Sequence, residues 1–135
     1  MLKNLMWYFQ DGWYLAAVNQ NCADACNSHN LECSEDEFYQ HNSEIDSSAE
    51  VIRMIKSLGG KVAIAWCGDE FGYAPDVPVF STSRNYCKYS GSSRPASSFN
   101  CMQLPTPENH NKQRICWCHK AGYLYLFVHN VMLVI

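Results

Sequence analysis

The stretch Cys22-Ala-Asp-Ala-Cys26-Asn-Ser-His-Asn-Leu-Glu-Cys33 and its counterpart Arg114-Ile-Cys116-Trp-Cys118 decide how this chain folds. Cys22 and Cys26 are four residues apart, which places both thiols on one face of a short helix over residues 21–29. Cys116 and Cys118 are two residues apart and share one face of a closing strand over residues 114–118. Because regular structure opposes a bond within either pair, we expect all four to bond elsewhere in the chain.

The cysteines as a set indicate the cellular compartment. All eight lie between Cys22 and Cys118, and the other four are Cys33, Cys67, Cys87 and Cys101. An even number at this density is typical of small secreted domains held by disulfides, whereas the cytosol keeps thiols reduced. We therefore predict four disulfides and a secreted location or one in the lumen of the Golgi or endoplasmic reticulum. The pairing stays open, because eight cysteines can pair in many ways.

Length and charge limit the remaining classes. The chain has 135 residues, with 10 Lys and Arg against 13 Asp and Glu, which predicts one domain without the basic surface that attracts nucleic acid. We expect no nucleic-acid partner. We place the cysteine-rich module at residues 13–119, between an N-terminal flank at 1–12 and an apolar C-terminal tail at 120–135.

The two flanks differ in composition from the middle. The apolar run before Gln10 is too short for a secretory signal, so we expect the chain to be a fragment of a longer secreted protein. The tail is shorter than the roughly 20 residues that span a bilayer and is interrupted by His129 and Asn130. It is either a buried strand or a truncated membrane anchor, and only the anchor would imply a membrane partner.

The middle of the chain divides near Gly59-Gly60. Ser34-Glu-Asp-Glu37 and Ser47-Ser-Ala-Glu50 have the form of capping boxes, and they predict two further short helices, the second of which ends at Gly59. Residues 61–67 are β-prone and predict a buried strand. Residues 68–111 are rich in Gly, Pro, Ser and Asn, and we expect Cys87 and Cys101 to hold this irregular stretch in place.

These elements predict an α+β fold. We expect a small disulfide-rich domain with two or three short helices, followed by a loop-rich half with a few short strands.

The sequence indicates disulfides more strongly than it indicates a metal site or catalytic residues. Cys22 and Cys26 have the spacing of zinc ligands, but no second pair repeats it, so we predict no metal and no cofactor. A zinc-stabilised intracellular domain remains an alternative. The five histidines belong to no nucleophile signature, and we predict no catalytic residue. A non-catalytic interaction module is therefore the leading reading, with enzyme activity left uncertain.

Aromatic side chains crowd the loop-rich half. We expect Trp66 and Trp117 to fill the core, whereas Tyr73, Tyr86 and Tyr89 are candidates for a binding surface. Tyrosine rings exposed on loops stack on sugars or contact partner proteins. The predicted partner is therefore a glycan or an extracellular protein.

The order of the cysteines resembles that of a known family. Trp13-x8-Cys22-x3-Cys26-x6-Cys33, an isolated Cys67, then Cys87, Cys101 and Arg114-x-Cys116-x-Cys118 resembles the cysteine-rich module at the C-terminal end of N-acetylglucosaminyltransferase V. Similar modules occur in secreted proteins of algae and marine animals. The family tends to have Gly where Asn19 and Asn30 stand, and Asn tolerates the same left-handed backbone. It tends to have Pro where Trp117 stands, which puts the closing strand in doubt.

The resemblance covers residues 13–118 and implies a lumenal or extracellular accessory module. The catalytic domain of such an enzyme is several times larger than this chain, so no catalytic residue carries over. The alternative is a fragment of a glycosyltransferase family 18-like N-acetylglucosaminyltransferase that lacks its catalytic domain.

Overall fold

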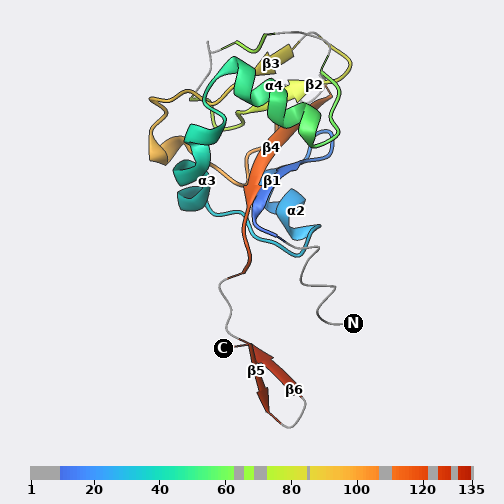
Figure 1. Cartoon of the computed structure of the whole chain (residues 1–135), viewed down its shortest axis with the longest axis vertical. Coiled ribbons are helices and arrows are strands. Elements are labelled where there is room, and N and C mark those ends of the chain that lie inside the picture. The colour runs from blue at the N-terminus through green and yellow to red at the C-terminus, as the bar shows by residue number, and fades with distance from the viewer. Residues whose placement is uncertain are drawn as a thin grey trace.

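An antiparallel sheet of four strands forms the centre of the molecule. The computed structural model describes residues 10–62, 66–68, 73–84, 86–106, 111–121, 125–128 and 131–134. The strand order is β1-β4-β2-β3, and the strands are β1 (Gly12–Leu15), β2 (Val79–Ser81), β3 (Tyr86–Lys88) and β4 (Lys112–Cys118). Figure 1 shows β4 running through the middle, with β1 paired along one edge and β2 along the other.

Three short α-helices lie beside the sheet in the described part of the chain, which confirms the α+β class. They are α2 (Cys22–Asn27), α3 (Glu35–His41) and α4 (Ser48–Ser57). The 3-10 turn η1 (Asn42–Glu44) follows α3, and the 3-10 turn η2 (Ala96–Ser98) lies in the loop between β3 and β4. Ser34 and Ser47 cap α3 and α4 as predicted, because each side chain accepts a hydrogen bond from the backbone N–H three residues later. Asn30 has φ 58° and Gly59 has φ 85°, so both occupy the left-handed backbone predicted after their helices.

Two adjacent disulfides join α2 to β4, and we call this pair the disulfide ladder and each bridge a rung. Cys22 bonds Cys116 and Cys26 bonds Cys118, with Cα–Cα distances of 5.5 and 5.3 Å. Four residues of helix rise about 6 Å, and two residues of strand rise about 6.7 Å. The two spacings match closely enough for both bridges to form side by side. The helix cysteines therefore bond to the strand cysteines, and no bridge forms within either pair.

The other two disulfides hold the loop-rich half in place. Cys33 bonds Cys101, and Cys67 bonds Cys87. Next to the second bridge, the backbone N–H of Gly68 donates to the carbonyl of Cys87. Cys87 and Cys101 therefore anchor the irregular stretch as predicted.

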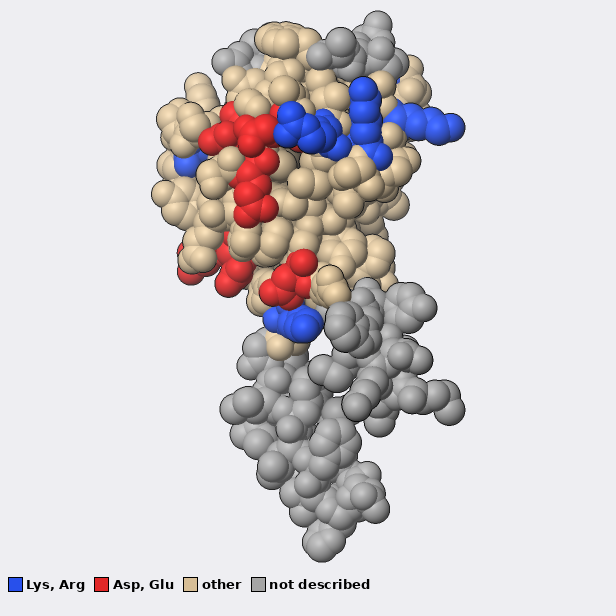
Figure 2. All heavy atoms as spheres, in the orientation of Figure 1, with Lys and Arg blue, Asp and Glu red and all other residues tan. Residues whose placement is uncertain are grey.

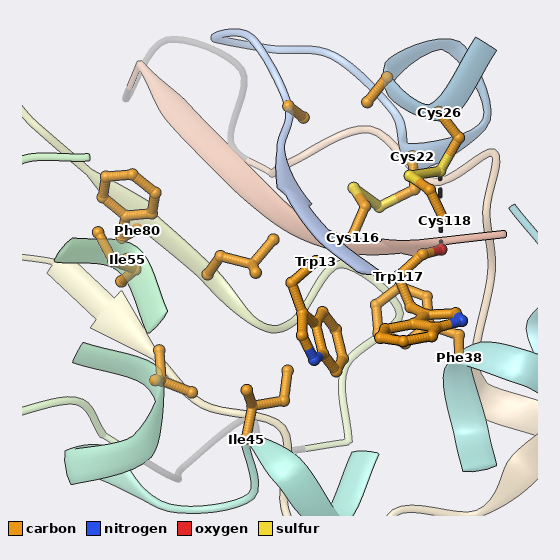
Figure 3. Packing of buried hydrophobic residues seen from close by; sticks show 14 of the residues in the cluster. Trp13, Cys22, Cys26, Phe38, Ile45, Ile55, Phe80, Cys116, Trp117 and Cys118 are labelled. Carbon is orange, nitrogen blue, oxygen red and sulfur yellow. Dashed lines mark hydrogen bonds between the residues drawn. A yellow bond between two sulfur atoms is a disulfide. The ribbon is translucent and has the colours of Figure 1, made fainter. Parts of the chain in front are cut away.

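The aromatic part of the hydrophobic core lies on the face of β4 opposite to α2, while the disulfides between α2 and β4 fill the core on the other face. Trp117 alternates with the two bridged cysteines along β4, so its ring points away from α2 (Figure 3). It meets Trp13 edge to face at 5.4 Å, and Trp13 meets Phe38 of α3 at 5.7 Å. Trp117 is buried as predicted, and β4 continues through it without interruption.

Arg114 organises the loops beside the sheet, a role that the sequence did not indicate. Its side chain is 0% exposed, and its guanidinium donates hydrogen bonds of 2.8–3.1 Å to four backbone carbonyls. These carbonyls belong to Pro75, Asp76, Asn100 and Gln103. Burial lowers the pKa of Arg114, and the carboxylates of Asp76 and Glu35 oppose that shift. Arg114 thus satisfies loop carbonyls that no regular structure pairs.

Two predictions for residues 61–67 are wrong. The residues described there, 61–62 and 66–67, are not in a strand, and residues 63–65 lie outside the described part of the chain. Trp66 is 61% exposed and does not fill the core. The adjacent Cys67 is fully buried and bonded to Cys87, so the chain enters the core at the cysteine and leaves Trp66 on the surface.

The apolar tail contains a two-stranded hairpin of β5 (Tyr125–Val128) and β6 (Val131–Val134), drawn at the bottom of Figure 1. Tyr125 pairs with Val134, and Val128 pairs with Val131. Its side chains lie outside what the structure describes, so burial of this segment stays a prediction. Among the described residues, no helix is long and apolar enough to cross a membrane.

Candidate binding pocket beside helix α3

A pocket of about 260 Å³ opens where α3 and η1 meet the loop before η2. One wall consists of Tyr39 and Gln40 of α3 with Asn42 and Ser43 of η1. The remaining lining residues are Asp46, Ser92 and Arg94. Figure 1 shows α3 beside η2, the two segments that contact each other near this pocket.

Tyr39 supplies the aromatic surface of the pocket. Its neighbour Phe38 is fully buried in the core, and the helical turn of about 100° per residue therefore directs Tyr39 outward. Tyr39 is 47% exposed, and its ring packs edge to face on Phe99 at 5.7 Å between ring centroids. The contact with Phe99 therefore holds the ring in place, while nearly half of the side chain stays exposed to solvent.

Arg94 fixes the loop that forms the opposite wall. Its guanidinium is buried and donates to the carbonyls of Val77 and Ser98 and to the hydroxyls of Ser90 and Ser98. The guanidinium carbon also lies 3.7 Å from the ring centroid of Phe99. Burial lowers the pKa of Arg94 to about 9, Arg114 adds to that shift, and Asp76 opposes it, so the group stays charged at neutral pH.

Asn42 joins the two walls and carries an unpaired acceptor. Its side-chain Nδ2 donates to the carbonyl of Gly91 at 3.0 Å, across 49 positions of sequence. Asn42 is only 6% exposed, yet its Oδ1 has no hydrogen-bond partner among the described residues. Buried polar atoms in native proteins nearly always have a partner, but this oxygen is closed off from solvent, so it belongs to the wall and not to the surface that a ligand would touch.

Carboxylates dominate the surface around the pocket. Burial raises the pKa of Asp46, and the charge of Glu50 and a hydrogen bond to it raise the pKa further, against a backbone hydrogen bond that lowers it. Glu37 and Glu44 both pair with His41, whose ring stacks on Trp117, and they do not line the pocket. Figure 2 shows acidic side chains gathered over α3 and the start of α4, next to a group of basic side chains farther along α4. The negative charge at the pocket itself therefore comes from Asp46, with Glu50 beside it.

The structure does not gather the three predicted tyrosines in this pocket. Tyr73 is 63% exposed. Tyr86 and Tyr89 are half-buried, and the ammonium of Lys112 lies 3.9 Å from the ring centroid of Tyr86. A role for these tyrosines in binding stays a prediction. The sequence did not predict this pocket because Asn42 and Ser92 are distant in the chain. The outward position of Tyr39 could have been predicted, because it follows the core residue Phe38 in a helix.

The cysteines leave no thiolate for a metal. All eight, Cys22, Cys26, Cys33, Cys67, Cys87, Cys101, Cys116 and Cys118, are in disulfides. Cys33, Cys101 and Glu35 come close together, but the two sulfurs are bonded to each other. Four disulfides favour an oxidising environment, either secreted or lumenal.

No protein-family model matches the chain, and no curated protein matches it.

Proposed function

We propose that this chain is a non-catalytic interaction module of the secretory pathway or extracellular space, and that it binds glycans. The observation that supports binding is the pocket beside α3, where an exposed aromatic ring stands among amide, hydroxyl and carboxylate groups. Sugars offer apolar ring faces together with dense hydroxyl groups, so an amphipathic tyrosine with polar neighbours suits them. A protein partner would use the same exposed groups and is the other outcome of the test.

A glycan array followed by a pull-down from extracellular fluid tests this function. The oxidised chain should retain at least one glycan class with a dissociation constant below about 1 mM. A reduced and alkylated sample is the control, because it keeps the composition of the chain but loses the pocket. Retention of no glycan and no protein by the oxidised form would contradict the proposal.

We also propose that the chain is related to the glycosyltransferase-associated modules that it resembles. A backbone observation favours this: Asn19 and Asn30 have φ 61° and 58°, the left-handed conformation for which glycine is best suited. Those are the two positions where the resembling modules tend to have Gly. Recovery of the complete transcript tests this relation, since a glycosyltransferase origin requires a long α/β region upstream. A transcript without one would exclude the fragment reading.

A further inference from the structure

We propose that the pocket beside α3 binds a single uncharged pyranose residue at the end of a glycan, with one face of the sugar stacked on Tyr39. This inference rests on the proposed function, and it names the site and the class of sugar. Four independent features of the pocket support it.

The size of the pocket suits one sugar ring. A cavity of about 150 Å³ holds benzene, so the 260 Å³ measured here corresponds to about 10 non-hydrogen atoms at the same density. A pyranose ring with part of its hydroxyl groups fills that volume. A second ring would have to extend out of the pocket, which places the bound residue at the end of a chain.

The aromatic surface is organised before a ligand arrives. Tyr39 lies on α3, its ring rests on Phe99, and Phe99 in turn packs on the guanidinium of Arg94. Arg94 is fixed by its four hydrogen bonds to the loop around it. Because these contacts already restrict the ring of Tyr39, stacking a sugar on it loses little side-chain freedom.

Polar side chains around the ring give the pocket partners for sugar hydroxyls. Gln40, Ser43 and Ser92 line the pocket, and their amide and hydroxyl groups can both donate and accept hydrogen bonds. Asn42 supports this wall through its hydrogen bond to Gly91. Polar atoms of this kind set the orientation of a ligand that an aromatic ring alone would hold loosely.

The charge around the pocket selects against acidic sugars. Asp46 lines the pocket, and the charge of Glu50 acts on it from the start of α4. The one cation of the pocket lining, Arg94, already donates four hydrogen bonds to its own loop. A carboxylate or sulfate on the sugar would meet repulsion without a partner arranged to neutralise it.

The test is a titration of the oxidised, isotope-labelled chain followed by NMR. The neutral probes are the methyl glycosides of glucose, galactose, mannose and N-acetylglucosamine, and the anionic probes are N-acetylneuraminic acid and glucuronic acid. We expect at least one neutral probe to shift the amide signals of Tyr39, Asn42 and Ser92. The anionic probes should bind at least about tenfold more weakly.

Three variants make the test specific. Tyr39→Ala should weaken binding of the neutral probe by about tenfold, whereas Tyr39→Phe, which keeps the ring, should change it little. Trp66→Ala is the control, because Trp66 is an aromatic residue that is more exposed than Tyr39 and does not line the pocket. Thermal unfolding of each variant checks that its fold is retained.

The outcomes separate this inference from the proposed function. Sugar binding that persists in Tyr39→Ala, or that shifts signals elsewhere, would overturn the pocket and leave the glycan-binding module intact. Equal binding of neutral and anionic probes would overturn the charge selection. Absence of any sugar binding in both the titration and the glycan array would overturn the inference together with glycan binding as the function.

Discussion

The ladder of two disulfides between α2 and β4 predicts that its rungs are coupled in stability. Cys22–Cys116 and Cys26–Cys118 span 94 and 92 residues, but the bridge Cys33–Cys101 lies inside both spans and shortens both loops. Through that bridge either rung alone closes about 26 residues, which stabilises by about 3.5 kcal/mol in the chain-entropy model. Once one rung exists, the other closes fewer than about ten residues, which is worth only about 2 to 3 kcal/mol.

Three variants therefore remove the rungs one at a time and together. Cys22→Ala with Cys116→Ala removes the first rung, Cys26→Ala with Cys118→Ala removes the second, and the quadruple variant removes both. We expect each single-rung loss to lower the free energy of unfolding by about 2 to 3 kcal/mol and the double loss to lower it by about 6 kcal/mol. The double loss then exceeds the sum of the single losses by about 1 kcal/mol.

Urea unfolding followed by circular dichroism measures these differences. Packing losses from Cys→Ala contribute equally to both sides of the cycle and cancel. A thiol titration should find no free thiol in either single-rung variant, because each change removes both members of a bridge. If the quadruple variant does not fold in buffer, all four proteins are compared in the same concentration of sucrose. Single-rung losses of about 3.5 kcal/mol each, adding without excess, would refute the ladder.

Three further predictions concern the charges and the loops. Arg114→Met should lower the free energy of unfolding by about 3 to 5 kcal/mol because four carbonyls lose their donor. The exposed Arg84→Met is the control, and equal effects in urea unfolding would contradict the role of Arg114. Asp46→Asn should raise the melting temperature slightly at pH 7, because the raised pKa of Asp46 means that folding disfavours its ionised form. That gain should vanish near about pH 3, where the carboxyl is protonated in both states, and a larger gain in acid would contradict it. Reduction of the disulfides should expose the amides of residues 68–111 to hydrogen exchange before those of α4, which carries no cysteine, and the reverse order would refute this.

The local features of the fold could be predicted from the sequence because they depend on neighbouring residues. Capping by Ser34 and Ser47, the left-handed Asn30, and the shared faces of both cysteine pairs all follow from spacing over a few positions. The matching rises of α2 and β4 then account for the pairing of the ladder, although the sequence alone left that pairing open.

Features that depend on distant contacts could not be predicted in this way. The strand β1 acquires its conformation from pairing with β4, a hundred positions or more away, and its Trp13 and Tyr14 favour a strand but are too few to predict one. Arg114 looks like an ordinary polar residue of a strand until the loops that it bonds are in place. Asn42 and Gly91 are likewise 49 positions apart, so only the folded chain reveals the pocket between them.

The disulfide pairing is the central claim, and peptide mapping without reduction tests it most directly. Cleavage before Asp24 separates Cys22 from Cys26, and cleavage after Trp117 separates Cys116 from Cys118. With free thiols blocked beforehand, mass spectrometry should find Cys22 linked to Cys116 and Cys26 linked to Cys118. The intact chain should weigh about 8 Da less than its reduced form, one hydrogen for each bonded sulfur. Crossed links between these four cysteines, or blocked thiols on any of the eight, would contradict the account.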